Sequence, residues 1–359
     1  MKVGILTIHC NYNYGALLQS YALQEYLLSL GHEVYIINYR PRYLESLEPK
    51  YRLRPCKDIK GYLKSNFNEI PLLRKKYFKF QKFESLLSLT AVVKTKHEIG
   101  KIAKDFDYVV FGSDQIWCNM FNGKENVWFG DIECDNVKKV SYAASAGDAN
   151  FTDEEISSIV PLLNQFKAIA VREQKLFNIL RPLVDASVPM NCVLDPSLMA
   201  PQSLWKKWYS PVRKDRYIVV RMARDYQGIY EMAEHLAKQM NCTIVNADVR
   251  QISFNSGYEV CACSPNEFVS LIKNAQCVLT NSFHGTAFSI VTNTPFYTVR
   301  MDDNQDERSL DLLKALGICD RMVEKGAVID FSSINYDEVN KELDKLRMKS
   351  QQFLKEQIT

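Results

Sequence analysis

The chain has 359 residues, of which 47% are hydrophobic and 24% charged, and its formal net charge is +3. This composition is typical of a globular protein and excludes a disordered chain, and the length allows two hydrophobic cores. No run of apolar residues approaches the length of a membrane-spanning helix. We therefore expect two domains.

The amino-terminal residues do not resemble a secretory signal. One lysine and a short apolar run precede Asn11, and no small-residue cleavage site follows them. The sequence therefore predicts a cytoplasmic protein.

Ten cysteines are scattered along the chain, and two of them, Cys261 and Cys263, are close together. A zinc site usually needs a second pair of ligands, and the sequence offers no second pair at a suitable spacing. In a strand this spacing places both side chains on one face, where cysteines commonly serve as small buried hydrophobic residues. We expect reduced thiols, no metal and no cofactor.

The first 38 residues follow a strand, loop, helix and strand pattern. Lys2–His9 is expected to form a strand, Asn11–Gly15 a loop, Ala16–Leu30 a helix and Glu33–Asn38 the next strand. This order is typical of the opening βαβ unit of a Rossmann-like domain.

The segment from Arg40 to Lys82 is strongly basic. It holds thirteen Lys or Arg residues against four acidic ones, a local charge of +9, and aromatic residues alternate with the basic ones. A solvated basic face is the first interpretation, and docking on an anionic membrane surface is the second. No groove-reading motif accompanies the segment, which argues against nucleic acid.

Polar residues follow several predicted strands of the first half. Asp114 comes after the apolar strand Tyr108–Phe111, where a carboxylate can take a proton from a substrate hydroxyl, although an aspartate that caps a helix would look the same. Weaker candidates at later strand ends are Ser145, Asp148 and Arg172, the last of which can form an internal ion pair with Glu173.

Prolines near residues 195–211 interrupt the periodic pattern, and a second strand, helix and strand follow at Tyr217–Arg221, Ile229–Met240 and Cys242–Asn246. The sequence therefore predicts an α/β fold with Rossmann-like domains at residues 1–195 and 196–335. An amphipathic closing helix is expected at residues 336–359. The carboxyl ends of the two sheets are expected to face each other across a cleft.

The segment Gln276–Arg300 places a histidine between a strand and a helix. Gln276–Thr280 has strand composition, Thr286–Val291 can start a helix, and His284 lies in the turn between them. In parallel sheets ligands bind at the carboxyl ends of the strands, where helix N-termini attract anions. His284 is therefore a candidate acid–base group, although a lone histidine is more often structural.

Thr280–Gly285 resembles the signature of the polysaccharide pyruvyl transferase family, in which Arg or Ser, then Leu or Phe, precede His-Gly. Other family-like segments occur in the same order as in the family, namely Asn13–Gln19, Gly112–Trp117, Tyr142–Ser145, Val171–Glu173 and Leu194–Pro196. Together they span about residues 3–318.

The resemblance implies a GT-B-like fold, with the first domain on the acceptor side and the second on the donor side. It implies transfer of the enolpyruvyl unit of phosphoenolpyruvate onto two hydroxyls of a sugar, in a bacterial surface polysaccharide or its lipid-linked precursor. The products are a pyruvate ketal and phosphate, so phosphoenolpyruvate is a substrate rather than a cofactor. A lipid-linked acceptor would bring the basic segment to the inner face of the plasma membrane.

The resemblance also suggests roles for individual residues. His284 is expected to act either as the acid–base group or as a hydrogen-bond donor to the phosphate, and Asp114 as the base for the acceptor hydroxyl. The residues expected to bind substrates are Arg221, Arg224, Asn281, Ser282, Gly285 and Arg308 on the donor side and Asn13, Gly15 and Trp117 on the acceptor side. Asn13 and Gly15 can equally form a plain helix cap.

One position departs from the family pattern. Many relatives have Arg where this chain has Ser282, so another cation, from Arg221, Arg224, Arg300 or Arg308, must compensate if the donor is the same. Two alternatives therefore remain open. One is a GT-B glycosyltransferase that uses a nucleotide sugar, and the other is a non-catalytic glycan-binding protein.

Overall fold

The computed structural model describes the chain apart from residues 48–58, 119–124, 135, 148–149, 248 and 250–257, and it leaves out the side chains of residues 45–69. Asp148 and much of the basic segment therefore lie outside the described residues. The chain divides into two compact units. The first consists of Met1–Glu48, Ser85–Ala200 and Glu342–Thr359, and the second of Pro49–Glu84 and Pro201–Lys341.

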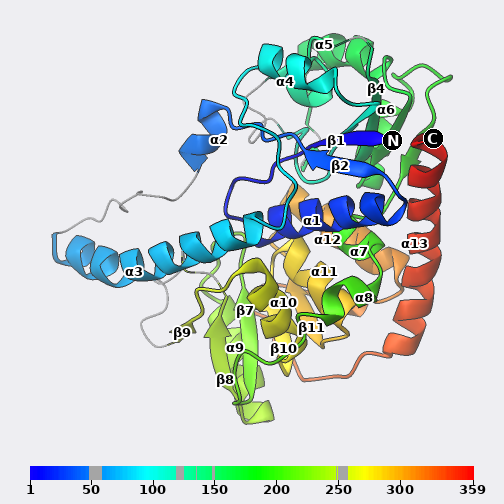
Figure 1. Cartoon of the computed structure of the whole chain (residues 1–359). Helices are drawn as coiled ribbons and strands as arrows, with labels where there is room; N and C mark the ends of the chain where they lie inside the picture. Colours follow the sequence, from blue (N-terminus) through cyan, green and yellow to red (C-terminus); the bar gives the residue numbers. More distant parts are fainter. Residues whose placement is uncertain (48–58, 119–124, 135, 148–149, 248, 250–257) are drawn as a thin grey trace. The chain divides into compact units, whose positions relative to one another are not determined.

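The first unit is built on a six-stranded sheet in which all neighbours are parallel and the strand order is β2-β1-β3-β4-β5-β6. Figure 1 labels β1, β2 and β4 of this sheet. β3 and β5 are buried along their whole length, and β1 and β4 are buried at all residues but the first, as expected where helices cover both faces of a parallel sheet. The strands are β1 (Lys2–Leu6), β2 (Glu33–Ile36), β3 (Tyr108–Phe111), β4 (Lys138–Ala144), β5 (Ala168–Val171) and β6 (Met190–Cys192).

The helices of the first unit follow its strands in an alternating order. They are α1 (Tyr14–Ser29), α2 (Arg42–Leu47), α4 (Lys96–Ala103), α5 (Asp153–Leu163), α6 (Gln174–Leu180) and α7 (Pro196–Met199), with the short 3-10 helix η1 (Asn126–Phe129).

The second unit contains a second parallel six-stranded sheet, with the order β12-β11-β10-β7-β8-β9. Numbered within the unit, this order is 6-5-4-1-2-3, the Rossmann arrangement, whose direction of winding reverses between β7 and β10. The strands are β7 (Tyr217–Arg221), β8 (Thr243–Asn246), β9 (Glu259–Val260), β10 (Cys277–Thr280), β11 (Phe296–Val299) and β12 (Met322–Val323).

The helices of the second unit include α3, which precedes it in the sequence. They are α3 (Ile59–Glu84), α8 (Gln202–Lys206), α9 (Ile229–Met240), α10 (Pro265–Lys273), α11 (Phe283–Thr292) and α12 (Glu307–Ala315), with the 3-10 helices η3 (Asn304–Asp306) and η4 (Cys319–Arg321). The final helix α13 (Tyr336–Gln357) begins in the second unit and continues in the first.

The predicted strand–helix–strand segments are present, and two of their helices begin earlier than predicted. Helix α1 begins at Tyr14 rather than at Ala16, because the Asn13 side chain accepts a hydrogen bond from the N–H of Gly15 and so caps the helix (2.9 Å). Helix α11 begins at Phe283 rather than at Thr286, because Ser282 caps it. Because the capping residues start both helices earlier, the loops before them are shorter than composition predicted.

The predicted closing helix is confirmed. Its apolar residues Val339, Leu343, Phe353 and Leu354 are buried, while the lysines between them are exposed. Among the described residues, no helix combines the length and the apolar character needed to cross a bilayer.

Candidate functional site

The carboxyl ends of β7 and β10 are joined at the point where the winding of the second sheet reverses. β7 ends at Arg221 and β10 ends at Thr280, and these two residues are paired in the sheet register. The Thr280 hydroxyl donates to the Arg221 carbonyl (2.6 Å), and the N–H of Asn281 donates to the same carbonyl (3.3 Å). Polar residues that follow the two strands are therefore held close together, where ligands of this fold class bind.

Helix α11 starts directly after β10, and its first turn is built around a glycine. The Ser282 side chain accepts from the N–H of Gly285 (3.4 Å), and the Ser282 carbonyl accepts from the N–H of Thr286 (3.0 Å). A Cβ atom added to Gly285 would lie 2.3 Å from the hydroxyl oxygen of Thr280. Gly285 is therefore required for the close approach of α11 to β10, and Ser282 is the helix cap.

His284 is the second residue of α11 and is half-buried. Its ring contacts the Phe283 ring edge-on, with centroids 5.2 Å apart. The guanidinium of Arg308, from the first turn of α12, lies 6.0 Å from the centroid of the same Phe283 ring. Phe283 thus contacts both the imidazole and a cation, and the positive end of the α11 dipole adds to the field at this point.

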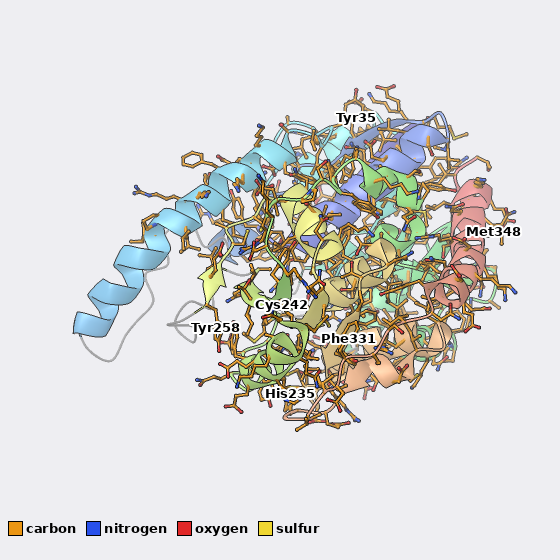
Figure 2. All side chains as sticks on the ribbon, turned by 90° about the horizontal axis from the view of Figure 1, so that it is seen from below. Tyr35, His235, Cys242, Tyr258, Phe331 and Met348 are labelled. Carbon is orange, nitrogen blue, oxygen red and sulfur yellow. The ribbon has the colours of Figure 1, made fainter. Side chains whose placement is uncertain are left out.

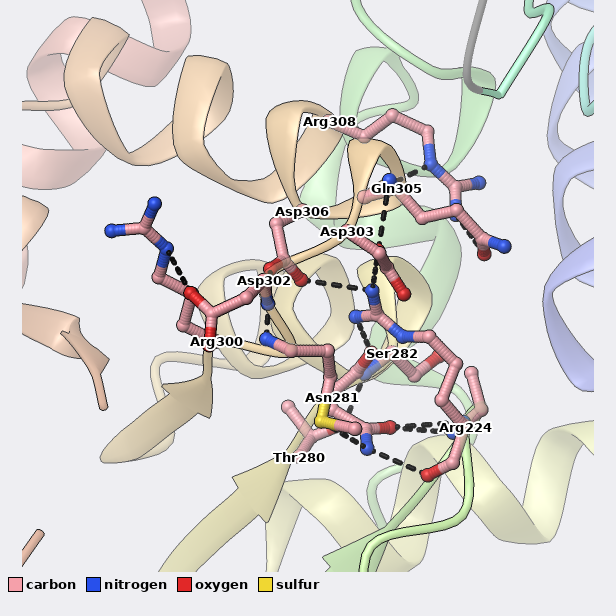
Figure 3. A network of polar contacts seen from close by, with 12 residues as sticks. Arg224, Thr280, Asn281, Ser282, Arg300, Asp302, Asp303, Gln305, Asp306 and Arg308 are labelled. Carbon is pink, nitrogen blue, oxygen red and sulfur yellow. Dashed lines mark hydrogen bonds and ion pairs between the residues drawn. The ribbon is translucent and has the colours of Figure 1, made fainter. Parts of the chain in front are cut away.

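Arg224 and Asn281 connect three loops at this edge of the sheet (Figure 3). The Arg224 guanidinium donates to the Asn281 carbonyl (2.7 Å), and it forms ion pairs with Asp306 (2.8 Å) and Asp303. The Asn281 side chain accepts from the N–H of Ala223 (2.7 Å) and donates to the Arg224 carbonyl (2.7 Å). Arg224 and Asn281 thus connect the loop after β7, the loop after β10 and the segment around Asp303 and Asp306. The carboxylates of Asp303 and Asp306 offset the charge of Arg224.

The remaining arginines at this edge differ in their surroundings. Arg221 is buried and its guanidinium donates to the Met222 carbonyl. Arg308 donates to the backbone and side-chain oxygens of Gln305 (3.4 and 3.2 Å). Arg300 is exposed and forms ion pairs with Asp302 and Glu324. All three arginines therefore remain candidates for contact with an anionic substrate.

In the first unit, Asp114 lies three residues after the end of β3, near the carboxyl end of this strand as predicted, and is half-buried. Its backbone has a φ of 72°, and its carbonyl accepts from the N–H groups of Ser145 and Ile116 (3.1 and 2.8 Å). The Asp114 carboxylate is close enough to act electrostatically on Arg172, which follows β5. The carboxyl ends of three strands thus contribute to one polar edge.

Trp117 does not have the exposed ring that stacking on a sugar requires. Its side chain is 0% exposed, its indole N–H donates to the Trp128 carbonyl (2.8 Å), and its ring stacks on Phe129. The sequence predicted that Trp117 binds the acceptor, whereas the structure places its side chain in the hydrophobic core. An aromatic residue at a strand end looks the same in sequence whether it points outward or into the core.

Asn13 caps α1, and its side chain is exposed while Gly15 is buried. The helix-cap interpretation left open by the sequence is thus realised for both residues, and it does not prevent Asn13 from contacting a substrate.

The polar edge of the first unit contains a buried charge network that the sequence only partly indicated. The Arg172 guanidinium contacts Glu173 (3.1 Å), as predicted, and also Asp195 (2.9 Å). The hydroxyls of Ser145 and Ser113 donate to Glu173 and Asp195, respectively (2.5 and 3.1 Å). Burial disfavours the charge of Arg172, but the neighbouring carboxylates outweigh this effect and raise its pKa. Asp195 could have been suspected from the Asp-Pro step that starts α7.

A pocket of about 700 Å³ lies in the second unit. Its lining comes from the end of α9 and the start of β8, at the amino edge of the second sheet, and includes Cys242 and Tyr258 (Figure 2). In the part of the chain that the structure describes, no group of three His, Cys, Asp or Glu side chains is placed to hold a metal ion.

A family model described as polysaccharide pyruvyl transferase matches residues 13–303. This range contains the carboxyl ends of β7 and β10, with Arg221 and His284. Arg308 lies outside it. No curated protein matches the chain at a significant level.

Several solved structures resemble the whole chain at low identity. UDP-GlcNAc 2-epimerase from Neisseria meningitidis, bound to UDP-GlcNAc, has 10% identity and a TM-score of 0.50, over 100% of this chain and 99% of that chain. UDP-GlcNAc 2-epimerase from Methanocaldococcus jannaschii has 14% identity and a TM-score of 0.47, over 96% of this chain and 92% of that chain. UGT89C1 from Arabidopsis thaliana has 10% identity and a TM-score of 0.46, over 99% of this chain and 95% of that chain. The Neisseria likeness concerns the fold alone, and with the two parallel sheets it confirms the predicted α/β class of two Rossmann-like domains, the GT-B type.

Proposed function

Because the chain belongs to the polysaccharide pyruvyl transferase family, a family of transferases, we propose that it transfers the enolpyruvyl unit of phosphoenolpyruvate to two hydroxyls of a sugar. The acceptor is part of a bacterial surface polysaccharide or of its lipid-linked precursor. In the reaction, C3 of the donor takes a proton, C2 bonds to two sugar oxygens, and the bond between C2 and the phosphate oxygen breaks. The hydroxyl protons leave with a base, and the products are a pyruvate ketal and phosphate.

The observation that carries this proposal is the position of His284. It stands in the first turn of α11, in contact with Phe283, which also contacts the Arg308 guanidinium. An imidazole there can give a proton to C3 or donate a hydrogen bond to the phosphate, and the helix N-terminus favours an anion. We assign to Asp114 the role of taking a proton from the acceptor hydroxyl.

Ser282 stands at a position where many relatives have Arg. Here the side chain caps α11, and the guanidinium of Arg224 donates to the carbonyl of the preceding residue, Asn281. We propose that Arg221 and Arg308 provide positive charge for the donor, because Arg221 ends β7 beside Thr280 and Arg308 lies 6.0 Å from the centroid of the Phe283 ring that also contacts His284. Arginine suits both anionic groups of the donor because its planar fork binds two oxygens at once.

The proposal is tested by supplying donors separately with a panel of synthetic galactosides, N-acetylhexosamines and lipid-linked sugars. With phosphoenolpyruvate, phosphate release that depends on the acceptor and a ketal product in the mass spectrum are expected. Product from a UDP-sugar instead would identify a glycosyltransferase. Sugar binding in calorimetry without turnover of either donor would identify a glycan-binding protein, and either result would overturn the proposal.

Arg221→Lys is expected to raise the Michaelis constant for phosphoenolpyruvate. An ammonium cannot reproduce the two-pronged contact, and the loss of a charge-assisted hydrogen bond costs about 1.5–3 kcal/mol, or roughly ten- to a hundredfold in affinity. The matched control is Arg216→Lys, at the opposite end of the same strand, where the guanidinium contacts Gln276. An unchanged donor constant in Arg221→Lys, with the control also unchanged, removes Arg221 from the donor site.

We also propose that one face of α3 docks on an anionic membrane surface. Arg74, Lys75 and Lys82 are exposed, and Phe78 between them is 66% exposed. At 3.6 residues per turn these four positions fall within an arc of about 100°. An exposed aromatic ring flanked by cations suits the boundary between headgroups and acyl chains. Lys76 and Lys79 do not belong to this face, because Lys76 is buried and Lys79 is paired with Glu267 (2.5 Å).

Vesicle cosedimentation tests this face. Binding should require anionic lipid and fall as salt rises, since each basic residue near the surface contributes about 1 kcal/mol. The variant with Arg74, Lys75 and Lys82 changed to Glu should lose binding, and its activity on a soluble acceptor should persist. The charge-matched control reverses exposed lysines 341, 349 and 355 on α13. Equal losses in both variants would show that net charge, and not the α3 face, determines binding.

A further inference from the structure

The guanidinium of Arg224 contacts two carboxylates of the second unit. Its Nη1 atom lies 2.8 Å from Asp306 and is also ion-paired with Asp303, while its Nη2 atom donates to the Asn281 carbonyl (2.7 Å). Its Nε atom is buried and has no hydrogen-bond partner among the described residues. Two negative charges therefore share one nitrogen of a single cation, while another nitrogen of the same guanidinium lacks an acceptor.

Asp306 is fixed beside Arg224 by contacts of its own. Its side chain is 7% exposed, and one of its oxygens accepts from the N–H groups of Met301 and Asp302 (2.7 Å each). The other oxygen contacts Arg224. Because a buried carboxylate that loses its cation is strongly destabilising, Asp306 is the permanent partner of Arg224.

Asp303 is held less firmly than Asp306. Its side chain is 42% exposed, and the oxygen that contacts Arg224 also accepts from the N–H of Gln305 (2.9 Å), which caps the short helix η3. The cap does not depend on Arg224, and the released carboxylate stays in contact with water. Since an exposed ion pair contributes little free energy, Asp303 is the exchangeable partner of Arg224.

The place of this ion pair is suited to an anionic ligand. Arg224 contacts the carbonyl of Asn281, directly before the residue that caps α11. The guanidinium of Arg308 donates to the side chain of Gln305 (3.2 Å), so both arginines contact the short segment that contains η3 (Figure 3). The Asp303 carboxylate thus already makes the contact with Arg224 that a carboxylate or phosphate of a ligand would make.

We propose that an anionic group of the donor displaces Asp303 from Arg224. Arg224 then binds the donor, and Asp303 sets the donor's affinity because it competes for the same guanidinium. This inference rests on the proposed function in that the donor carries a carboxylate and a phosphate. On displacement, the ion pair with Asp306 and the cap of η3 remain, and the surplus negative charge moves into solvent.

Calorimetric titration with phosphoenolpyruvate, and separately with inorganic phosphate, measures this competition. Asp303→Asn removes the charge and keeps an oxygen that can cap η3. It should bind both anions roughly three- to fivefold more tightly than wild type, the size expected when a partly exposed ion pair no longer competes. The matched control is Asp302→Asn, which removes a neighbouring charge that is paired with Arg300 and Lys325. An equal effect in the control, or no effect in Asp303→Asn, overturns the proposal.

A double-mutant cycle tests whether the effect acts through Arg224. Arg224→Gln alone should weaken the binding of both anions. Adding Asp303→Asn to this variant should bring no improvement, because the guanidinium for which Asp303 competes is gone. An equal improvement in both backgrounds would show that the donor does not contact Arg224. Circular dichroism checks that each variant is folded, and the comparison of Asp303→Asn with wild type stands by itself if Arg224→Gln does not fold.

The titrations do not depend on turnover, and UDP serves as a third probe. If Asp303→Asn binds UDP more tightly than wild type while phosphoenolpyruvate neither binds nor reacts, the proposed pyruvyl transfer fails and the displacement of Asp303 stands. If phosphoenolpyruvate reacts but binds equally to both proteins, transfer stands and the displacement is wrong. Failure of all three anions to bind Asp303→Asn also overturns the displacement.

Discussion

Replacement of His284 by alanine is expected to lower pyruvyl transfer by about two to four orders of magnitude and to leave the fold unchanged. General acid–base groups contribute roughly 10²–10⁴-fold to rates. The fold should tolerate the change because the side chain is half-buried in the first turn of α11, and the packing of this turn on β10 depends on Gly285 and Thr280. Steady-state kinetics with phosphoenolpyruvate, together with circular dichroism, measures both quantities. The matched control is His235→Ala, a histidine on α9 of the same unit whose side chain is 42% exposed, and this variant should retain activity.

A second substitution distinguishes the two roles proposed for His284. Glutamine can donate a hydrogen bond to the donor phosphate but cannot exchange a proton in the neutral pH range. If His284 only holds the phosphate, His284→Gln should keep most of the maximal rate. If it transfers the proton, glutamine should be as inactive as alanine, and added imidazole should restore part of the activity. Turnover of His284→Ala within about threefold of wild type, less than 1 kcal/mol of barrier, would falsify both roles.

Arg172→Leu should destabilise the first unit by about 3–5 kcal/mol, because it leaves the carboxylates of Glu173 and Asp195 buried without their cation. For a unit of this size such a loss corresponds to a decrease in Tm of roughly 6–20 °C. Differential scanning calorimetry is the suitable measurement, because the two units need not unfold in one transition. Arg172→Lys, which keeps the charge but loses the planar fork, should fall between wild type and Arg172→Leu.

The control for this prediction is an exposed ion pair in the same unit. Lys345 contacts Glu342 on α13 (2.7 Å), and exposed pairs contribute at most about 1 kcal/mol. Lys345→Ala should therefore leave the Tm almost unchanged. A shift in Arg172→Leu no larger than in this control would show that the buried carboxylates find other partners or take up protons at little cost.

Secondary structure was largely predictable because its signals are local. Helix α9 has the predicted bounds, Ile229–Met240, and the capping box at Ser264 and Glu267 starts α10. The strands were visible as apolar runs because both faces of a parallel sheet are covered. The errors occurred at element ends, where a single capping hydrogen bond, such as that of Ser282, decides where a helix begins.

Site residues were less predictable because their roles depend on partners far away in the sequence. Arg224 is occupied by acidic residues about 80 positions later, and Lys79 is paired with Glu267, 188 positions away. Likewise Trp117, which follows a strand end and could have been exposed, is enclosed by Trp128 and Phe129.

The sequence by itself determined the family, the order of strands and helices, and the position of His284 at the start of a helix, since each of these depends on residues adjacent in the chain. Only the tertiary structure decided which polar side chains are engaged within the protein, as Arg172 and Arg224 are, and which belong to an exposed face, as Arg74 and Lys75 do. The physical reason is that the packing of segments far apart in the sequence sets the burial and the hydrogen-bond partners of each side chain. Two arginines that look alike in sequence can therefore differ, because one forms an ion pair with a buried carboxylate and the other lies on an exposed face.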